Sequence, residues 1–226
     1  MKLSIKIGGH VLYEGGELIA NRLLSYASIL KKMYWLGHSL CVVIGGGEPA
    51  RRFIEVAKRV GCNEAICDEI GIGISRINAL IFASLLGDDA YPSIPSNYFE
   101  AKEALSSGKI VVCGGFQPGQ STVAVAASMA ELMRADLLVV ATDVDGVYSA
   151  DPKEDPKAVK LTKLTYRDLE KFLTFKAEAG TYKLFDLLAI KILERAKIPT
   201  VVVDGRDPSV LFKILEGEAV GSLIVA

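Results

Sequence analysis

The chain has 226 residues, half of them hydrophobic, with 26 lysine and arginine residues against 27 aspartate and glutamate residues. A net charge of −1, without a basic or acidic run, excludes the electrostatic footprint of a nucleic-acid or membrane-surface protein. This length suits one large core or two lobes that share a sheet, and the apolar content is typical of a sheet buried on both faces.

The four cysteines lack the spacing of a zinc site or a redox pair. Cys41 and Cys113 lie in apolar, strand-like runs, whereas Cys62 and Cys67 are five residues apart. We therefore expect free thiols in a reducing cytoplasm and no metal-binding cluster. The N-terminus is typical of a charged strand rather than a signal peptide, and we expect no apolar run to approach the length of a membrane span.

The first two thirds of the chain repeat one pattern, in which an apolar strand ends in small residues. Most of these loops precede a segment with helical spacing of apolar residues. In chain order we expect strands at 3–7, 40–44, 110–113 and 137–141, and helices at about 17–36, after Pro49, and at about 69–86, 99–105 and 121–133. This order predicts parallel strands joined by helices, and hence an α/β fold.

The remaining third of the chain does not continue this pattern, but it contains no linker-like segment. We expect, in order, a surface loop at 153–163, a helix at 166–172, a loop at 175–182, a helix at 184–196, a strand at 200–203, a helix at 210–215 and a strand at 222–225. The sequence therefore predicts a single domain with two lobes, about 1–134 and 135–226.

A lysine lies just before the glycine pair that ends the first strand, in Lys6-Ile7-Gly8-Gly9. Its ammonium group could lie beside phosphate oxygens, because the glycines let backbone amides approach closely. The alternative is an edge-strand lysine before a tight turn. His10 follows directly and is a further candidate.

Three glycines, Gly45-Gly46-Gly47, end the second strand, and Arg51 follows one helical turn later. Their amides would face an anion at the positive end of a helix. The pattern is neither a P-loop nor a dinucleotide fingerprint. The alternative is a tight strand-to-helix turn.

Two further segments could bind a ligand. Asp68 lies at the expected start of a helix, where a carboxylate usually caps the helix, and the residues alone favour that reading. The loop Gly114–Thr122 offers amides and hydroxyls to an anion, while Phe116 or Gln117 could contact a flat base. The alternative for this loop is a flexible segment in which Ser121 caps the next helix.

The stretch from Ala135 to Pro152 begins as a buried strand and ends in polar loop residues. Ligands of open α/β sheets lie beyond the carboxyl ends of the strands. The alternative is a strand that leaves the core through an ordinary Asp-Gly turn.

The segment 142–152, Thr-Asp-Val-Asp-Gly-Val-Tyr-Ser-Ala-Asp-Pro, resembles the nucleotide-binding segment of the amino acid kinase family. Gly-Gly-Phe-Gln-Pro-Gly-Gln-Ser-Thr, at 114–122, resembles the UMP-binding loop of archaeal uridylate kinases within that family. The resemblance covers the whole chain. It implies a three-layer αβα sandwich around a mainly parallel sheet, and transfer of the γ-phosphoryl group of ATP to UMP in pyrimidine nucleotide synthesis. It also implies a cytoplasmic homohexamer built as a trimer of dimers, with Mg²⁺ as cofactor.

The resemblance also implies roles for individual residues. The expected catalytic residues are Lys6, Gly9 and Arg51. The expected UMP-binding residues are Gly46, Asp68, Phe116, Gln117, Pro118, Gly119, Gln120, Ser121 and Thr122. The expected ATP-binding residues are Lys6, Ile7, Gly8, Gly9, His10, Gly47, Arg51, Thr142, Val144, Tyr148 and Asp151. No protein ligand is expected for Mg²⁺, which would bind the ATP phosphates and water.

Two features depart from the family pattern. Many relatives carry an aspartate after Ser/Thr-Thr that orients the catalytic lysine, and here that position is Val123. The lysine must then be held otherwise, or by Asp145, which we expect mainly to hold its own loop together. Lys183 stands where acetylglutamate kinases have a second phosphate-facing lysine, and a surface lysine is the alternative.

Other functions remain open on the same fold. An acetylglutamate kinase would leave Asp68 without a ribose to contact. An isopentenyl phosphate kinase would carry a histidine soon after the glycine loop, where this chain has Glu48-Pro49-Ala50-Arg51. Val123 also leaves open a non-catalytic oxyanion- or nucleotide-binding protein.

Overall fold

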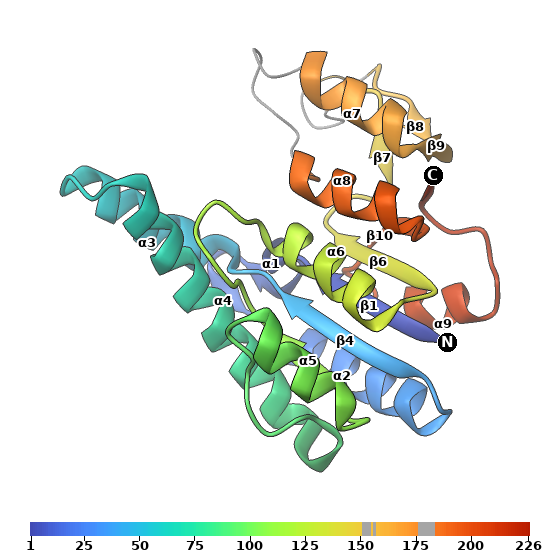
Figure 1. The fold of residues 1–226 in the computed structure, drawn as a ribbon. Helices are drawn as coiled ribbons and strands as arrows, with labels where there is room; N and C mark the ends of the chain where they lie inside the picture. Colours follow the sequence, from blue (N-terminus) through green and yellow to red (C-terminus); the bar gives the residue numbers. More distant parts are fainter. Residues whose placement is uncertain (151–154, 156, 176–183) are drawn as a thin grey trace.

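A computed structural model describes residues 1–150, 155, 157–175 and 184–226 (Figure 1). Seven strands form one sheet, in the order β5-β4-β1-β6-β10-β11-β9. Their bounds are β1 (Lys2–Ile7), β4 (Ser39–Ile44), β5 (Val111–Cys113), β6 (Leu137–Thr142), β9 (Lys163–Thr165), β10 (Thr200–Asp204) and β11 (Ser222–Val225). Neighbouring strands in this sheet run parallel except β10 and β11.

Helices cover both faces of the sheet and complete the expected three-layer αβα sandwich. Side chains on one face pack against α1 (Gly9–Leu12), α2 (Ala20–Trp35), α4 (Glu64–Leu86) and α9 (Val210–Leu215). Side chains on the other face pack against α5 (Tyr98–Ser106), α6 (Thr122–Met133), α7 (Tyr166–Phe175) and α8 (Leu187–Ala196). Helix α3 (Gly47–Arg59) packs against α4 (Figure 1). Each core layer extends across both predicted lobes.

The alternation of strand residues decides which side of the sheet each group in β1 reaches. Leu3, Ile5 and Ile7 lie in the α2 and α4 layer. Ser4 faces the opposite layer, where its hydroxyl donates to the carbonyl of Ala126 in α6 at 2.9 Å. Lys6 shares the face of Ser4 and therefore lies on the α6 side of the sheet.

The early segment expected to be one helix from about residue 17 begins instead with a hairpin. Strands β2 (Tyr13–Glu14) and β3 (Glu17–Leu18) pair antiparallel, and α2 starts only at Ala20. Gly15 and Gly16 form the turn with φ of 59° and 85°, a left-handed conformation that glycine adopts without strain.

Helix α4 starts five residues earlier than expected. Asn63 is its N-cap and accepts from the N–H of Ile66 at 3.0 Å. By length and composition, the described helix Glu64–Asp89 could cross a membrane, so the expectation that no apolar run approaches that length is wrong here. A helix in the core of a folded domain meets the same two criteria, and polar side chains of α4 bind the loops described below.

Two expectations concern the region after β6. Residues 153–163 were expected to be a surface loop, but β8 (Lys160–Leu161) pairs with β7 (Val147–Tyr148), and β9 begins at Lys163. The expected loop at 175–182 lies almost entirely outside the described residues.

Candidate active site

The carboxyl ends of β1 and β4 bring two glycine segments into direct contact. A Cβ atom on Gly9 would lie 2.0 Å from the backbone nitrogen of Gly47, and one on Gly45 would lie 2.7 Å from the nitrogen of Gly9. Gly47 itself has a φ of 70°. Backbones this close leave no room for side chains, so glycine is required at Gly9 for steric reasons and at Gly47 for conformational ones. The N–H of Gly8 donates to the carbonyl of Ala141 at 2.8 Å and extends the pairing of β1 with β6.

Lys6 lies beside this contact. Its side chain is half-buried, and its Nζ would be 3.2 Å from a Cβ atom placed on Gly8. Burial lowers the pKa of Lys6 from 10.5 to about 8, and the negative charge of Asp143 limits the decrease. A desolvated ammonium group beside glycine backbone is suited to bind phosphate oxygens.

Arg51 is the second cation at the site. It lies one turn into α3, where its guanidinium group contacts the ring Nε2 of His10. His10 belongs to α1, so this contact joins the helices that follow the two glycine segments. The structure thus brings Lys6, Gly9, Gly47, His10 and Arg51 to the same edge of the sheet.

Helix α4 supplies side chains that fix the glycine segments, and the sequence analysis assigned them no role. Asn78 donates to the carbonyls of Gly45 at 2.9 Å and Gly46 at 3.3 Å, and it accepts from the Tyr13 hydroxyl at 2.6 Å. Asn78 is buried, so these bonds satisfy its amide where water is excluded.

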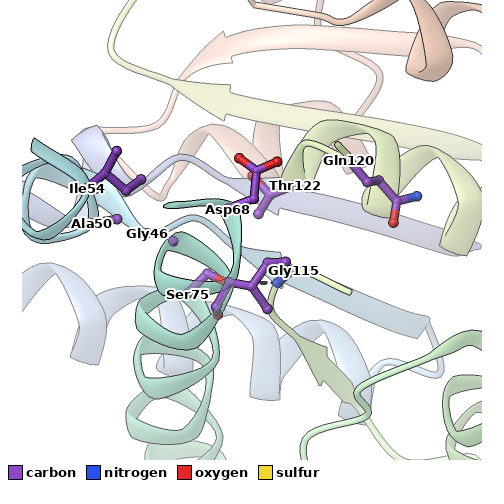
Figure 2. A pocket seen from close by; sticks show the side chains of 11 residues that line it. Gly46, Ala50, Ile54, Asp68, Ser75, Gly115, Gln120 and Thr122 are labelled. Atoms are coloured by element: carbon purple, nitrogen blue, oxygen red, sulfur yellow. Dashed lines mark hydrogen bonds between the residues drawn. The ribbon is translucent and has the colours of Figure 1, made fainter. Parts of the chain in front are cut away.

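Two further α4 side chains hold the loop after β5. The Ser75 hydroxyl accepts from the N–H of Gly115 at 2.7 Å, and Arg76 donates to the carbonyls of Gly115 and Phe116 at 2.9 and 3.1 Å. Figure 2 shows the Ser75–Gly115 bond as a dashed line. One helix therefore fixes two loops that are about 70 residues apart in sequence.

A cavity of about 190 Å³ lies between α3, α4 and the loop before α6. Four of the residues predicted to bind UMP, namely Gly46, Asp68, Gln120 and Thr122, line it. The other lining residues, which the sequence did not single out for UMP, are Gly47, Ala50, Ile54, Gly71, Ile72, Ser75 and Gly115 (Figure 2).

Asp68 does not cap a helix. It lies inside α4, one turn after the true N-terminus, and its Oδ2 accepts from the N–H of Gly119 at 2.8 Å. The capping interpretation favoured by the residues alone is therefore wrong, because α4 starts at Glu64. The carboxylate instead links α4 to the loop before α6 and faces the cavity (Figure 2).

Some residues of the loop before α6 stabilise the loop and its neighbours, and others line the cavity. Phe116 is buried and packs edge-on against Tyr98, with ring centroids 4.9 Å apart. Ser121 is the N-cap of α6 and accepts from the N–H of Ala124 at 3.1 Å. Gln117 and Pro118 are exposed, and neither they nor Phe116 and Ser121 line the cavity.

Gln120 both stabilises the loop before α6 and lines the cavity. Its amide donates to the Tyr98 hydroxyl, while its Oε1 is buried and has no hydrogen-bond partner among the residues that the structure describes. In Figure 2 its side chain points away from Asp68.

The loop after β6 is held by its own side chains. The carboxylate of Asp145 accepts from the Tyr148 hydroxyl at 2.6 Å and from the Lys160 ammonium at 2.9 Å. These contacts lower the pKa of Asp145. Asp145 therefore holds the loop together, as expected, and its charge is not directed at Lys6.

Close packing shapes the same loop. A Cβ atom on Gly146 would lie 2.5 Å from the Ser222 hydroxyl oxygen, which accepts from the N–H of Val147 at 2.8 Å. Thr142 and Val144 are buried. Asp151 and Lys183, the other two residues named from the sequence for this side, lie outside the described residues.

The cations and backbone amides at this edge of the sheet suit a polyphosphate. Over the described ranges, no group of three or more His, Cys, Asp or Glu residues is arranged to bind a metal. The described site offers the ammonium group of the half-buried Lys6, a guanidinium group and two interlocked glycine segments, with the cavity next to them. Cations and backbone amides of this kind can bind phosphate oxygens.

Comparison with known proteins agrees with this geometry. The model of the amino acid kinase family matches residues 1–204. A uridylate kinase from Methanosarcina barkeri is 47% identical over 97% of this chain and 93% of that protein. A uridylate kinase from Methanobrevibacter smithii is 40% identical over the full length of both chains.

Solved structures give the same result. The crystal structure of uridylate kinase from Archaeoglobus fulgidus aligns over all of both chains with a TM-score of 0.88 and 39% identity. The UMP kinase from Bacillus anthracis aligns over 99% of this chain and 95% of that chain, with a TM-score of 0.81 and 27% identity. The chain belongs to the amino acid kinase family.

Proposed function

We propose that this protein is a UMP kinase that transfers the γ-phosphoryl group of ATP to UMP and releases UDP and ADP, in pyrimidine nucleotide synthesis. The observation that carries the proposal is the cavity lined by Gly46, Gly47 and Asp68, because Gly47 is in direct contact with Gly9, and Lys6 Nζ would be 3.2 Å from a Cβ atom on the adjacent Gly8. The names of the archaeal relatives and of the aligned structures support the same reaction.

The reaction needs charge neutralisation more than covalent chemistry. A phosphate oxygen of UMP attacks the γ-phosphorus of ATP, the bond from that phosphorus to the bridging oxygen breaks, and ADP leaves. The UMP phosphate is already ionised at neutral pH, so no strong general base is required. Lys6 and Arg51 offset the charge on the transferring group, while the amides of Gly9 and Gly47 donate to its oxygens.

Mg²⁺, bound to ATP phosphates and water, would add charge neutralisation and align the reacting groups. No residue of this chain is assigned as its ligand.

We assign two sub-sites. UMP takes the cavity, with its phosphate at Gly46 and its ribose hydroxyls donating to Asp68. The loop before α6 closes over it through Gly119, Gln120 and Thr122, and Phe116, Gln117, Pro118 and Ser121 shape that loop.

We place ATP on the side of the glycine segments that lies opposite the UMP cavity. Its phosphates lie along Gly8, Gly9, Gly47 and Arg51, and its nucleoside contacts the loop after β6. We assign Thr142, Val144, Tyr148 and Asp151 to the nucleoside, with Ile7 and His10 next to the phosphates. In this scheme residues 1–134 form the acceptor lobe and 135–226 the ATP lobe of one domain.

We also propose that the protein works in the cytoplasm as a homohexamer built from dimers. One surface supports self-association. Exposed apolar side chains gather on the two helices α3 and α4, and we call them the α3–α4 apolar face: Phe53, Val56, Val60, Ile66, Ile77, Leu80 and Ile81. The apolar side of α2 is instead part of the core, because Leu23, Ala27, Leu30 and Met33 are buried.

A coupled assay of ADP release, with ATP and Mg²⁺, tests the reaction. UMP, CMP, dUMP, acetylglutamate and isopentenyl phosphate are offered side by side, and we expect turnover with UMP and much slower turnover with the others. Lys6→Ala should lower kcat by roughly 100-fold or more, while ATP affinity changes little, because the lysine acts mainly in the transition state. ATP binding without turnover on any acceptor would instead favour a nucleotide-binding protein.

A further inference from the structure

To act on phosphate, the ammonium group of Lys6 must be held in place and must stay protonated. Helix α6 provides no side chain that does either. Ser4 and Lys6 share one face of β1, and Ser4 bonds to Ala126 one turn into α6. Lys6 therefore lies along the first turn of that helix, where Val123 is buried and apolar. The chain must place a negative charge near Lys6 from another element, or the lysine loses its proton near neutral pH.

The end of β6 is the element next to Lys6. Strands β1 and β6 are paired in parallel, with Lys6 opposite Val140 and Ile7 opposite Ala141. A Cβ atom on Gly8 would lie 3.2 Å from Lys6 Nζ, 3.1 Å from the Ala141 carbonyl and 3.7 Å from the Thr142 Cα. The ammonium group therefore lies where β6 ends and the chain continues into Asp143.

We propose that Asp143 is the positioning residue for Lys6, holding the ammonium group charged and aimed at the transferring phosphate. The inference rests on the proposed function and adds to it a residue that the family pattern did not point to. Asp143 follows Thr142, whose hydroxyl donates to Asp143 Oδ1 at 3.3 Å and so helps to fix the carboxylate.

The other carboxylates near the end of β6 are bonded to groups other than Lys6. Asp145 is bonded to Tyr148 and Lys160. From β10, Asp204 forms bonds of 2.5–3.0 Å with Arg206. The pKa of Arg206 is raised first by Asp204 and further by Asp143 and Asp145, so Asp143 lies in the field of two cations, Lys6 and Arg206.

The remaining groups at the site are cations or neutral. His10 and Arg51 come from α1 and α3 and contact each other, and the first turn of α6 has no acidic residue. Among the carboxylates that the structure describes, Asp143 is the one whose charge opposes the loss of the Lys6 proton. Asp143 thus holds the Lys6 ammonium group from the end of β6, as an acidic residue at position 123 would hold it from the start of α6.

The test is the alkaline limb of the pH profile of kcat/KM, which reports the pKa of groups in the free enzyme. Lys6 is active when protonated, so kcat/KM falls as pH rises through its pKa, near 8 in the unaltered protein. Asp143→Asn removes the charge that raises this pKa, so the limb should move to lower pH by roughly one unit. The acid limb, set by the UMP phosphate with a pKa near 6, should be common to all variants.

At pH 8 this shift corresponds to a roughly fivefold lower kcat/KM for Asp143→Asn, and the deficit should shrink toward pH 6. Asp143→Glu keeps the charge and should retain most of the original limb. Asp145→Asn is the matched control, because it neutralises a carboxylate two residues away in the same loop, and its limb should not move. A limb that stays in place in Asp143→Asn, or a loss that is equal at every pH, overturns the proposal.

A second measurement does not depend on turnover. Trace acetylation of Lys6 by acetic anhydride, read by mass spectrometry across pH, gives the pKa of the amine in the ligand-free protein. Asp143→Asn should lower that pKa by a similar amount, and Asp145→Asn should not. If the unaltered protein makes no ADP with UMP, the proposed function fails, yet the acetylation profile still decides the role of Asp143.

Discussion

At the scale of single residues, the site depends on groups that neighbouring backbone fixes in place. Asp68 is the clearest case, since a carboxylate within α4 accepts from the N–H of Gly119 with one oxygen and faces the cavity with the group as a whole. Lys6 is similar, because its position follows from β1, Gly8 and the end of β6. Both residues can therefore be tested by substitutions that keep the shape of the side chain.

Asp68→Asn should lower kcat/KM for UMP by roughly 10- to 100-fold, because hydrogen bonds from ribose hydroxyls to a charged acceptor contribute about 1.5–3 kcal/mol. The loss should be smaller for dUMP, which has one hydroxyl fewer, and KM for ATP should not change. Steady-state kinetics with both nucleotides measure this. Glu69→Gln, the exposed neighbouring carboxylate on α4, is the control. Equal losses for UMP and dUMP would contradict the ribose role.

At the scale of secondary-structure elements, α4 organises the acceptor side of the site. Asn78 holds the segment after β4, while Ser75 and Arg76 hold the loop after β5. The helix thus acts as a shared support for two loops, and weakening it should affect UMP and ATP together.

Asn78→Ala should leave the carbonyls of Gly45 and Gly46 without their buried donor, which costs about 1–3 kcal/mol. For a chain of this length we expect Tm to decrease by roughly 2–12 °C, together with a higher KM for both substrates. Calorimetry and kinetics check the two effects. Ser84→Ala removes an exposed hydroxyl that bonds within α4, and it should change neither. A normal KM for both substrates in Asn78→Ala would show that the glycine segment does not need this support.

The sequence predicted the elements that carry strong local signals. Apolar runs that end in glycine predicted β1 and β4, and an apolar run that ends in polar residues predicted β6. The structure brings Lys6, Gly9 and Gly47, which lie in or follow β1 and β4, to one edge of the sheet. The Gly15-Gly16 hairpin carried a signal that the longer helical pattern of α2 obscured. The three-residue strand β9 has too few residues for a pattern to show.

The parts that could not be predicted depend on contacts between distant segments. Nothing local distinguishes Asn78 or Ser75 from other polar residues on a helix, because their partners are 30 or more residues away. Asp143 was missed for the same reason, since only the pairing of β6 with β1 places it near Lys6.

At the scale of the whole molecule, the α3–α4 apolar face collects seven exposed apolar side chains along two helices that pack against each other. Exposed apolar side chains that gather in one area are typical of interaction surfaces, whereas single ones need no explanation. The α3–α4 apolar face lies along the helices that carry Arg51 and Asp68. Assembly through this face would therefore hold the acceptor side of the site against a second copy of the chain.

Ile77→Glu should lower the particle mass measured by light scattering after size-exclusion chromatography, because a charge would have to be buried at the contact. Leu24→Glu, on α2, alters a side chain of similar exposure, 53% against 54%, and should leave the mass unchanged. The reverse pattern would move the contact to α2, and a monomeric unaltered protein would contradict the homohexamer.

The central place of β1 has a consequence for how the chain is made. This strand carries Lys6 and lies between β4 and β6, so its second partner ends only at Thr142. At about 5–20 residues per second, a ribosome needs roughly 7–27 s after completing β1 to deliver β6. During that time the apolar side chains of β1 have at most one strand beside them. A chaperone that binds nascent apolar segments would therefore have its best opportunity at the same strand that later positions the catalytic lysine.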